Sequence, residues 1–220
     1  MNLAQRLTAE FIGTFTLIFI GVSSICVNSG LVGVAFAHGL ALVVMITALG
    51  HISGGHLNPA VTVGVLVGGK ISKTDAVAYI IAQLLGGVVG ALAVKAVIAP
   101  AMYDAVKLGT PMLGEGVSFG TGVLVELILT FFLVTVVYGS AVDGRAGKWG
   151  GLFIGLTVVM DILGTGPLTG ASMNPARTFG PALVGGYWDN HLVYWIGPLI
   201  GGLLAGIVYT RWLRKEGLVA

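Results

Sequence analysis

Long apolar runs separated by short polar connections fill most of the chain. A helix needs about 20 predominantly apolar residues to cross a hydrocarbon core of ~30 Å, and six runs qualify. The second and fifth are near the short end, as expected of helices that lead into re-entrant loops. Two further runs have only about ten residues, a length typical of re-entrant segments. The predicted spans are 7–27, 33–50, 75–98, 117–141, 148–165 and 191–213, and the short runs are 58–67 and 174–184.

The pattern repeats itself at an offset of 116 residues. Because each half holds three spans, an odd number, the second half must be inverted relative to the first. Inverted repeats with paired short helices place a binding or conducting site near the membrane midplane. We therefore expect one all-α membrane domain over residues 1–220, with repeats at about 1–98 and 117–220 joined by an extracellular connection, 99–116. The matching positions include Glu10 and Glu126, and the tripeptide Asn58, Pro59, Ala60 with its copy Asn174, Pro175, Ala176.

Composition supports a membrane protein. The chain is 56% hydrophobic and 9% charged, whereas a soluble domain carries about 25% charged residues. Its Lys and Arg residues form no basic stripe, which argues against nucleic-acid binding, and the single cysteine, Cys26, excludes an intrachain disulfide. No catalytic or metal-ligand spacing is present, so neither an enzyme nor a cofactor is expected. The first run lacks a cleavage site and is interpreted as a retained helix.

The distribution of Lys and Arg predicts the orientation, because these residues accumulate in cytoplasmic loops. With the N-terminus inside, eight lie on the inner side and two on the outer side. Both termini are therefore predicted to be cytoplasmic, and the compact chain favours a prokaryotic plasma (inner) membrane. The inner residues are Arg6, Lys70, Lys73, Arg145, Lys148, Arg211, Arg214 and Lys215, and the outer ones are Lys95 and Lys107.

Each copy of the tripeptide has the residues of a helix start. Pro suits the first turn, where its missing N–H would be unpaired anyway, and Asn is a preferred N-cap. With the side-chain oxygen used as the cap, the amide N–H₂ of Asn58 or Asn174 would point outward as a donor. A helix N-terminus adds about half a positive charge, so two such ends would repel cations. Irregular backbone at this depth must be buried or line water, which predicts a wet pore.

The same residues carry a resemblance. The segments HISGGHLNPAVTVG and GASMNPARTFGPAL, with AEFIGTF near the start, resemble the aquaporin family of water and small-solute channels along essentially the whole chain. The resemblance implies six spans with two half-helices, and a homotetramer with one pore per subunit. It also implies a passive channel in which each Asn amide bonds a passing water oxygen and turns the water so that the proton wire is broken.

Arg177 directly follows the second tripeptide, and a charged residue at such depth is costly and usually functional. In the aquaporin family, which the sequence resembles, this position is the arginine of the outer constriction. Carried over by spacing, the resemblance implies that His38, Ile162 and Ala171 complete this selectivity filter. The set is similar to the plant vacuolar-membrane type and differs from strict water channels, which have Phe and His in place of His38 and Ile162. Ammonia, hydrogen peroxide and urea are therefore candidate solutes beside water.

Buried carboxylates occupy equivalent places in the two halves, since Glu10 and Glu126 each lie 48 residues before the Asn of their tripeptide. The resemblance implies that each accepts hydrogen bonds from the loop before its own tripeptide; a proton relay is the alternative. Asp161, inside the fifth span, is expected to be solvated near the outer surface or paired with a partner such as His38. Loop carbonyls are candidates for a ladder of acceptors leading to the Asn pair: those of Gly54, Gly55, His56, Gly170, Ala171 and Ser172.

Three alternatives to a water channel stay open. An ion-coupled secondary transporter would need titratable groups at the midplane, where two Asn amides are predicted instead. A structural protein of cell junctions would not need an intact Arg177. A glycerol or small-polyol facilitator would have Asp after the arginine, a basic residue four positions further, and Pro with an aliphatic residue in the last span. Those positions hold Thr178, Ala182, Tyr194 and Trp195.

Overall fold

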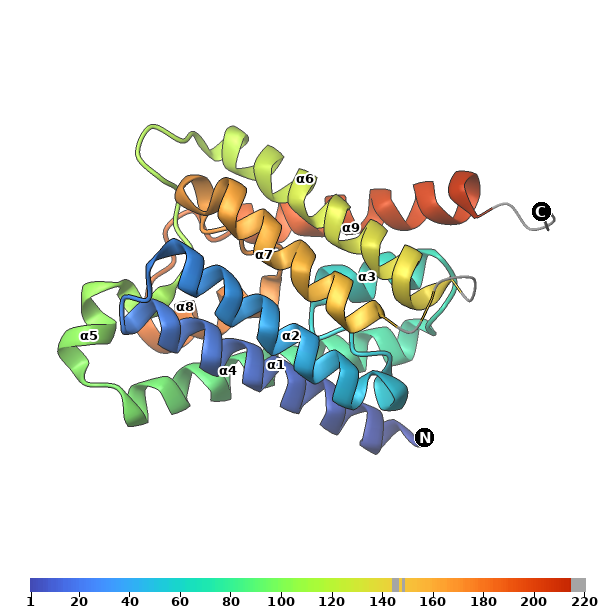
Figure 1. Ribbon diagram of the computed structural model, residues 1–220, viewed down its shortest axis with the longest axis horizontal. Helices are drawn as coiled ribbons and strands as arrows, with labels where there is room; N and C mark the ends of the chain where they lie inside the picture. Colours follow the sequence, from blue (N-terminus) through green and yellow to red (C-terminus); the bar gives the residue numbers. More distant parts are fainter. Residues whose placement is uncertain (144–146, 148, 215–220) are drawn as a thin grey trace.

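The structure is a computed structural model that describes residues 1–143, 147 and 149–214. The described residues form helices and connecting loops, without a strand. Among them, six helices are long and apolar enough to cross a membrane, and two shorter helices begin at the copied tripeptides. The predicted all-α fold with six spans and two half-helices is confirmed (Figure 1).

The helices follow the order expected of two repeats. The first half contains α1 (Leu3–Cys26), α2 (Gly30–Ser53), the half-helix α3 (Pro59–Val67) and α4 (Lys73–Val97). The connection predicted at 99–116 includes α5 (Pro100–Ala105) and a 3-10 turn, η1 (Lys107–Gly109). The second half contains α6 (Phe119–Val137) with a π-helical end η2 (Tyr138–Val142), α7 (Gly150–Thr169), the half-helix α8 (Pro175–Gly185), and α9 (Val193–Val208) with a π-helical end η3 (Tyr209–Leu213).

The second and fifth spans are longer than the predicted 33–50 and 148–165. α2 has 24 residues and α7 has 20, because neither helix stops at Gly50 or Gly166. Each ends instead at a glycine in the left-handed conformation, Gly54 (φ 94°) and Gly170 (φ 81°), whose N–H bonds the carbonyl four residues earlier. A left-handed glycine is a common helix terminator, whereas a glycine inside a helix only weakens it.

The two halves pack in the same way. α1 lies against α4 as α6 lies against α9, and α2 contacts α7 where the halves meet. Each half-helix packs on the last long helix of the other half, α3 on α9 and α8 on α4. The two half-helices lie toward opposite ends of the bundle (Figure 1), so their N-termini can meet in its middle.

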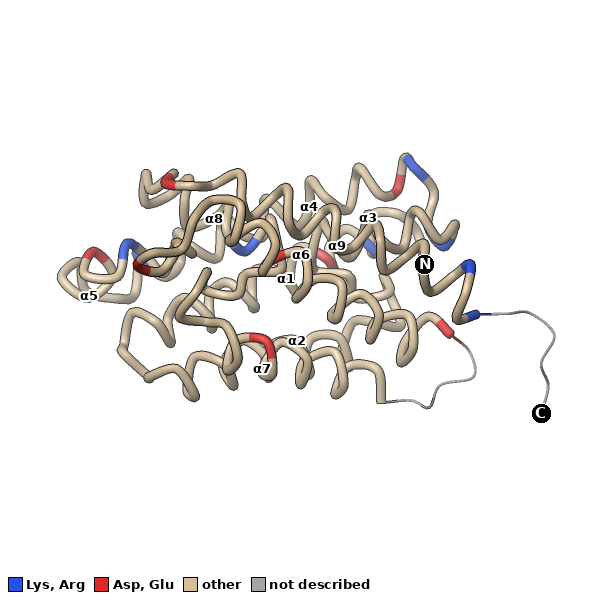
Figure 2. Tube along the Cα trace, turned by 90° about the horizontal axis from the view of Figure 1, so that it is seen from above, with Lys and Arg blue, Asp and Glu red and all other residues tan. Residues whose placement is uncertain are grey.

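Charged residues gather at the ends of the bundle. Most Lys and Arg segments lie at the end where both termini emerge, and few lie near α5 at the opposite end (Figure 2). This separation agrees with the predicted inner and outer sides. Of the residues used for that prediction, Arg145, Lys148 and Lys215 lie outside the described residues.

Glycines bring each half-helix close to its supporting helix. A Cβ built on Gly64 of α3 would lie 2.8 Å from the carbonyl oxygen of Gly202 in α9. A Cβ on Gly180 of α8 would collide with the carbonyl group of Gly87 in α4. Membrane helices use small residues for such approaches, since backbones then come within van der Waals contact. The half-helices are therefore seated on rigid backbone.

We expect Gly180→Ala to lower stability, because the added methyl group would meet backbone that cannot move aside like a flexible side chain. Overpacking of this kind costs about 1–3 kcal/mol. Gly164→Ala is the matched control, since Gly164 also lies in a helix but has open space where its Cβ would be. Thermal unfolding of both purified variants in detergent checks the expectation. Equal melting temperatures would contradict the close packing of α8 on α4.

Candidate conduction pore

Asn58 and Asn174 cap the two half-helices as the sequence predicts. The side-chain oxygen of Asn58 accepts a hydrogen bond from the N–H of Ala60 at 2.8 Å. The oxygen of Asn174 accepts from Ala176 at 3.0 Å and Arg177 at 3.2 Å. Pro59 and Pro175 occupy the first helical position, and Ala60 and Ala176 are fully buried. The two helix starts are thus built alike.

The amide nitrogens of the two Asn residues join the halves together. Nδ2 of Asn58 donates to the carbonyl of Met173 at 2.9 Å, and Nδ2 of Asn174 donates to the carbonyl of Leu57 at 2.9 Å. The expectation that both N–H groups point freely outward is therefore wrong for one N–H of each amide. Since each amide carries two N–H groups, one donor per Asn is left for the pore.

Leu57 and Met173 are functional residues that sequence reasoning missed. Both have positive φ, 50° and 54°, which is uncommon for residues other than glycine and turns each carbonyl toward the Asn of the opposite loop. Their signal in the sequence is only their position immediately before each Asn. Apolar side chains at these positions give no hint of a backbone role.

The buried carboxylates hold the loops, as the resemblance implies. Glu126 accepts from the hydroxyl of Thr169 at 2.7 Å and from the N–H groups of Ser172 at 2.9 Å and Met173 at 2.7 Å. Glu10 makes the equivalent bonds with Ser53, His56 and Leu57, and a fourth with the side-chain amide of Gln83 at 2.7 Å. Both carboxylates are fully buried, so their oxygens accept hydrogen bonds from protein groups, chiefly those of the loops.

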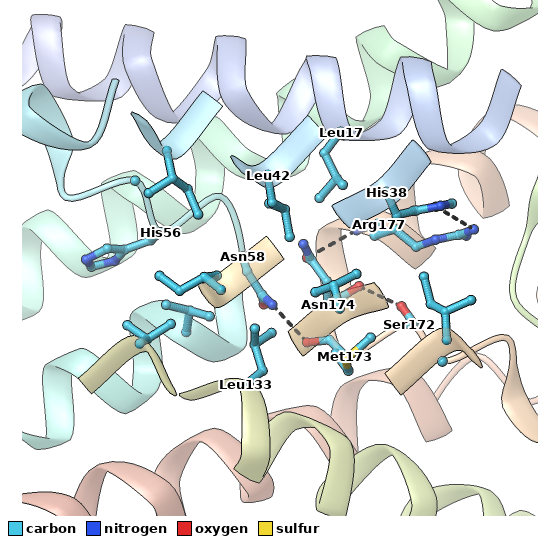
Figure 3. A pocket seen from close by; sticks show the side chains of 18 residues that line it. Leu17, His38, Leu42, His56, Asn58, Leu133, Ser172, Met173, Asn174 and Arg177 are labelled. Atoms are coloured by element: carbon cyan, nitrogen blue, oxygen red, sulfur yellow. Dashed lines mark hydrogen bonds between the residues drawn. The ribbon is translucent and has the colours of Figure 1, made fainter. Parts of the chain in front are cut away.

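Three hollows lie end to end through the bundle. The central cavity, of about 30 Å³, passes both Asn side chains. Figure 3 shows His38 and Arg177 at one end of it, His56 at the other, and Asn58 and Asn174 between them. An outer hollow shares Ile162 and Arg177 with the central cavity, and an inner hollow shares His56 and Val137 with it. The three hollows together resemble a pore. On each side of the Asn pair, a few shared residues separate the central cavity from the outer or the inner hollow.

The loop residues proposed as carbonyl acceptors follow this path. Gly54 lines the inner hollow and Gly170 the outer one. Positive φ at Gly54, Gly55, Gly170 and Ala171 gives the loops their irregular course. The ladder of carbonyl acceptors itself stays a prediction. Of the six proposed acceptor residues, four line the central cavity: Gly55, His56, Ala171 and Ser172.

The four predicted filter residues converge on the outer part of the cavity, since His38, Ile162, Ala171 and Arg177 all line it. Nδ1 of His38 lies 2.9 Å from the carbonyl of Val34. A carbonyl only accepts, so this nitrogen carries the proton. Nε2 is then the acceptor that faces Nη2 of Arg177 at 3.4 Å. A neutral imidazole therefore stands beside the guanidinium at the outer boundary.

Gly109 fixes the other side of Arg177. Its carbonyl accepts from Nη1 at 2.8 Å, which helps to satisfy a guanidinium that is only 4% exposed. Gly109 belongs to the connection 99–116, to which the sequence assigned no role. A backbone acceptor leaves no side-chain signature, so only the fold reveals it.

Asp161 is neither solvated nor paired with His38, so both expectations for it are wrong. It is 2% exposed, and its Oδ2 has no hydrogen-bond partner among the described residues. The next residue, Ile162, lines the pore, and consecutive helical residues point about 100° apart at 3.6 residues per turn. Asp161 is therefore buried among the helices, and it is not among the residues that line the central cavity.

Comparison with known proteins decides the family. Residues 1–209 match the family described as Major intrinsic protein. The chain belongs to the major intrinsic protein family, that of the aquaporins. Among aquaporin relatives, "Aquaporin TIP4-4" of Zea mays is 45% identical, over 97% of this chain and 88% of its own length. "Aquaporin TIP2-1" of Arabidopsis thaliana is 44% identical, over 91% and 84%. The aquaporin resemblance inferred from the two tripeptides is confirmed.

The aquaporin fold is also seen in a solved structure, the aquaglyceroporin from Plasmodium falciparum. It has a TM-score of 0.83 over 96% of this chain and 97% of that chain, at 23% identity, and at that identity the likeness concerns the fold alone. Family and helices together show an integral multi-pass membrane protein. The named aquaporin relatives are plant proteins, so they give no support to the expected prokaryotic plasma membrane. That expectation was based on chain length, which carries no information on the membrane in which a protein resides.

We expect Thr169→Val to destabilise the outer loop of this aquaporin. The hydroxyl donates to Glu126 and accepts from the N–H of Ala171 at 3.1 Å, so the variant leaves both partners unpaired in a buried place. Loss of a hydrogen bond to a charged group costs about 1.5–3 kcal/mol. The readouts are unfolding temperature and water permeability per channel, both of which should fall.

Thr165→Val, one turn earlier in α7, is the matched control for Thr169→Val. Its hydroxyl donates to the Asp161 carbonyl within the same helix at 2.8 Å, so this change should have little effect. Indistinguishable behaviour of the two variants would show that the Thr169 bonds do not support the loop.

Proposed function

We propose that this protein is a passive transmembrane channel that conducts water and excludes protons and other ions. The observation that carries the proposal is the pair of Asn side chains at the meeting point of two half-helix N-termini, inside the central cavity. Irregular backbone at membrane depth is tolerated where it lines water. Both tripeptides and Arg177 are present, and Asn58, Asn174 and Arg177 line the central cavity.

The Asn pair is suited to orienting a water molecule. Each amide has one N–H engaged with the opposite loop and one left as a donor. A water oxygen that accepts from both Asn58 and Asn174 has its own hydrogens directed outward along the pore, toward the loop carbonyls on either side. A water so turned cannot accept a hydrogen bond from its neighbours in the file, and proton hopping is interrupted there.

Fixed positive charge supports the exclusion of cations. Each half-helix N-terminus contributes about half an elementary charge, and Arg177 adds a full charge at the outer boundary. The cross-bonds between Asn residues and opposing carbonyls keep both helix ends near each other. A cation would therefore meet positive potential at the outer boundary and again at the centre of the cavity.

The outer filter supports small neutral solutes beside water. His38 and Ile162 stand where strict water channels, by resemblance, have Phe and His, and Ala171 adds little bulk. We include ammonia, hydrogen peroxide and urea as candidate solutes. Ammonia flux equal to that of bare lipid, alongside fast water flux, would restrict the proposal to water.

Two alternatives are less well supported by the residues. Tyr194, at a position that distinguishes the glycerol branch, is fully buried and donates to the carbonyl of Thr169 at 2.8 Å, so it serves the scaffold. An ion-coupled transporter would need free titratable groups at the midplane of the pore. Glu10 and Glu126 are occupied by loop donors, and Asp161 is not among the residues that line the central cavity. Passive conduction without chemistry on the solute also argues against an enzyme.

We further propose a homotetramer with cytoplasmic termini. The family supports the tetramer, and the gathering of Lys and Arg near both termini supports the orientation (Figure 2). Light scattering of the detergent-solubilised protein should give the mass of four chains, whereas a monodisperse single chain would refute this part.

Stopped-flow shrinkage of proteoliposomes tests the channel. We expect water efflux much faster than through bare lipid and with weaker temperature dependence, because a pore removes the need to dissolve water in hydrocarbon. Flux no faster than that of empty vesicles at verified protein incorporation would refute the proposal.

Arg177→Ala should admit cations while keeping water flux. One charge at about 4 Å contributes about 1–4 kcal/mol between bulk water and a partly buried site, so proton or ammonium leakage should rise roughly tenfold or more. A pH-sensitive dye inside proteoliposomes measures the leak. Lys95→Ala, at the outer end of α4, is the matched control, because it removes a charge outside the path and should leave the leak unchanged. If neither variant alters the leak, Arg177 does not contribute to the barrier against cations.

A further inference from the structure

The outer filter has an apolar counterpart on the inner side of the Asn pair. We call it the inner ring; its members are Ile46, Gly55, Val61 and Ile154. Each of them lies 116 residues from one filter residue in the internal repeat. All four line the same central cavity as the filter does. The repeat therefore places a second set of four residues around the pore.

The inner ring and the filter stand well apart along the pore. Ile46 follows His38 by eight residues in α2, and Ile154 precedes Ile162 by eight residues in α7. At a rise of 1.5 Å per residue, these pairs are separated by ~12 Å along their helices. The Asn pair lies between the two levels, because it sits at the pseudo-symmetry centre of the repeat.

The inner ring and the outer filter occupy equivalent positions of the repeat, but the ring has apolar residues where the filter has its two polar ones. Ile154 takes the place of His38, and Val61 takes the place of Arg177. Ile46, Val61 and Ile154 are 8%, 3% and 5% exposed, so they are packed at the cavity wall. No side chain of the ring can donate or accept a hydrogen bond.

His56, on the inner side of the cavity, has one ring nitrogen engaged with another side chain. Nδ1 of His56 lies 3.1 Å from the hydroxyl of Thr62, and its ring packs edge-on against Tyr79 with centroids 5.2 Å apart. Figure 3 shows this side chain at the far end of the cavity, beyond Asn58. His56 thus belongs to the boundary with the inner hollow and does not make the ring polar.

We propose that the inner ring is a second selectivity barrier, in series with the outer filter, that slows polar neutral solutes larger than water, urea among them, by partly dehydrating them. Apolar constrictions control permeation through the loss of solute hydration. Water can keep its bonds to neighbours in the file and to loop carbonyls, whereas urea or glycerol carries more polar groups than one line of acceptors satisfies. This inference deepens the proposed function and rests on it.

Two barriers in series give a distinctive pattern of permeabilities, because their resistances add. If the inner ring and the outer filter are barriers of similar height, widening only one of them raises urea permeability by at most about twofold. Ile162→Ala opens the outer level and Ile154→Ala opens the inner level. The double variant should exceed the product of the two single effects. Ile128→Ala, on the outward face of α6 with Ile128 40% exposed, is the control and should change nothing.

Urea and water permeabilities of all five proteins are measured in proteoliposomes at equal incorporation. If Ile162→Ala alone reaches the urea permeability of the double variant, the outer filter is the only barrier and the inner ring proposal is overturned. Ile46→Ala in α2 replaces Ile154→Ala should the latter not fold, with the same expected pattern. Water flux of the unaltered protein reports on the channel function separately: fast water flux with the wrong urea pattern overturns only the ring, whereas absent water flux overturns both.

A second comparison separates dehydration from width. In the Ile162→Ala background, Ile154→Val and Ile154→Thr give side chains of nearly the same shape, and only Thr carries a hydroxyl. We expect the Thr variant to pass urea at least about twofold faster, because it offers the solute a hydrogen bond at the ring. Equal urea permeabilities would overturn the dehydration mechanism.

Discussion

Backbone N–H groups at the middle of a membrane must find acceptors, and in this protein two buried carboxylates supply them. Glu10 and Glu126 each bond consecutive N–H groups of one loop. Unpaired, such groups would each cost several kcal/mol in hydrocarbon. The carboxylates thereby fix where each loop runs, and the loops fix where Leu57 and Met173 present their carbonyls. The Asn caps, the helix ends and the pore all depend on that placement.

Much of the architecture was predictable because it follows from length and repetition. Apolar runs of sufficient length give the six spans, and the copied tripeptides give the half-helix starts. The ends of α2 and α7 were misplaced because a glycine stops a helix only when it turns left-handed, as at Gly54 and Gly170. That conformation depends on the loop beyond it, which the local sequence does not reveal.

The parts of the site that escaped prediction are backbone groups and a buried side chain. Gly109 bonds Arg177 through a carbonyl, a group that every residue possesses, so nothing in the sequence distinguishes it. The charge of Asp161 predicted a polar environment, but the packing around it gives its Oδ2 no hydrogen-bond partner among the described residues. The filter residues, in contrast, were carried over from the family resemblance. Ile162 was placed by its distance from Asn174, and His38 by the Gly39-Leu40 pair that follows it.

The cross-bonds also impose an order on biosynthesis. Asn58 bonds a carbonyl 115 residues later in the chain, and α3 rests on α9, a helix that is synthesised long after α3. When the first half enters the bilayer, its half-helix has neither its supporting surface nor its hydrogen-bond partner. Closure of the centre must therefore be a late event of assembly. A nascent chain halted before α9 would contain both Asn residues and still lack a finished pore.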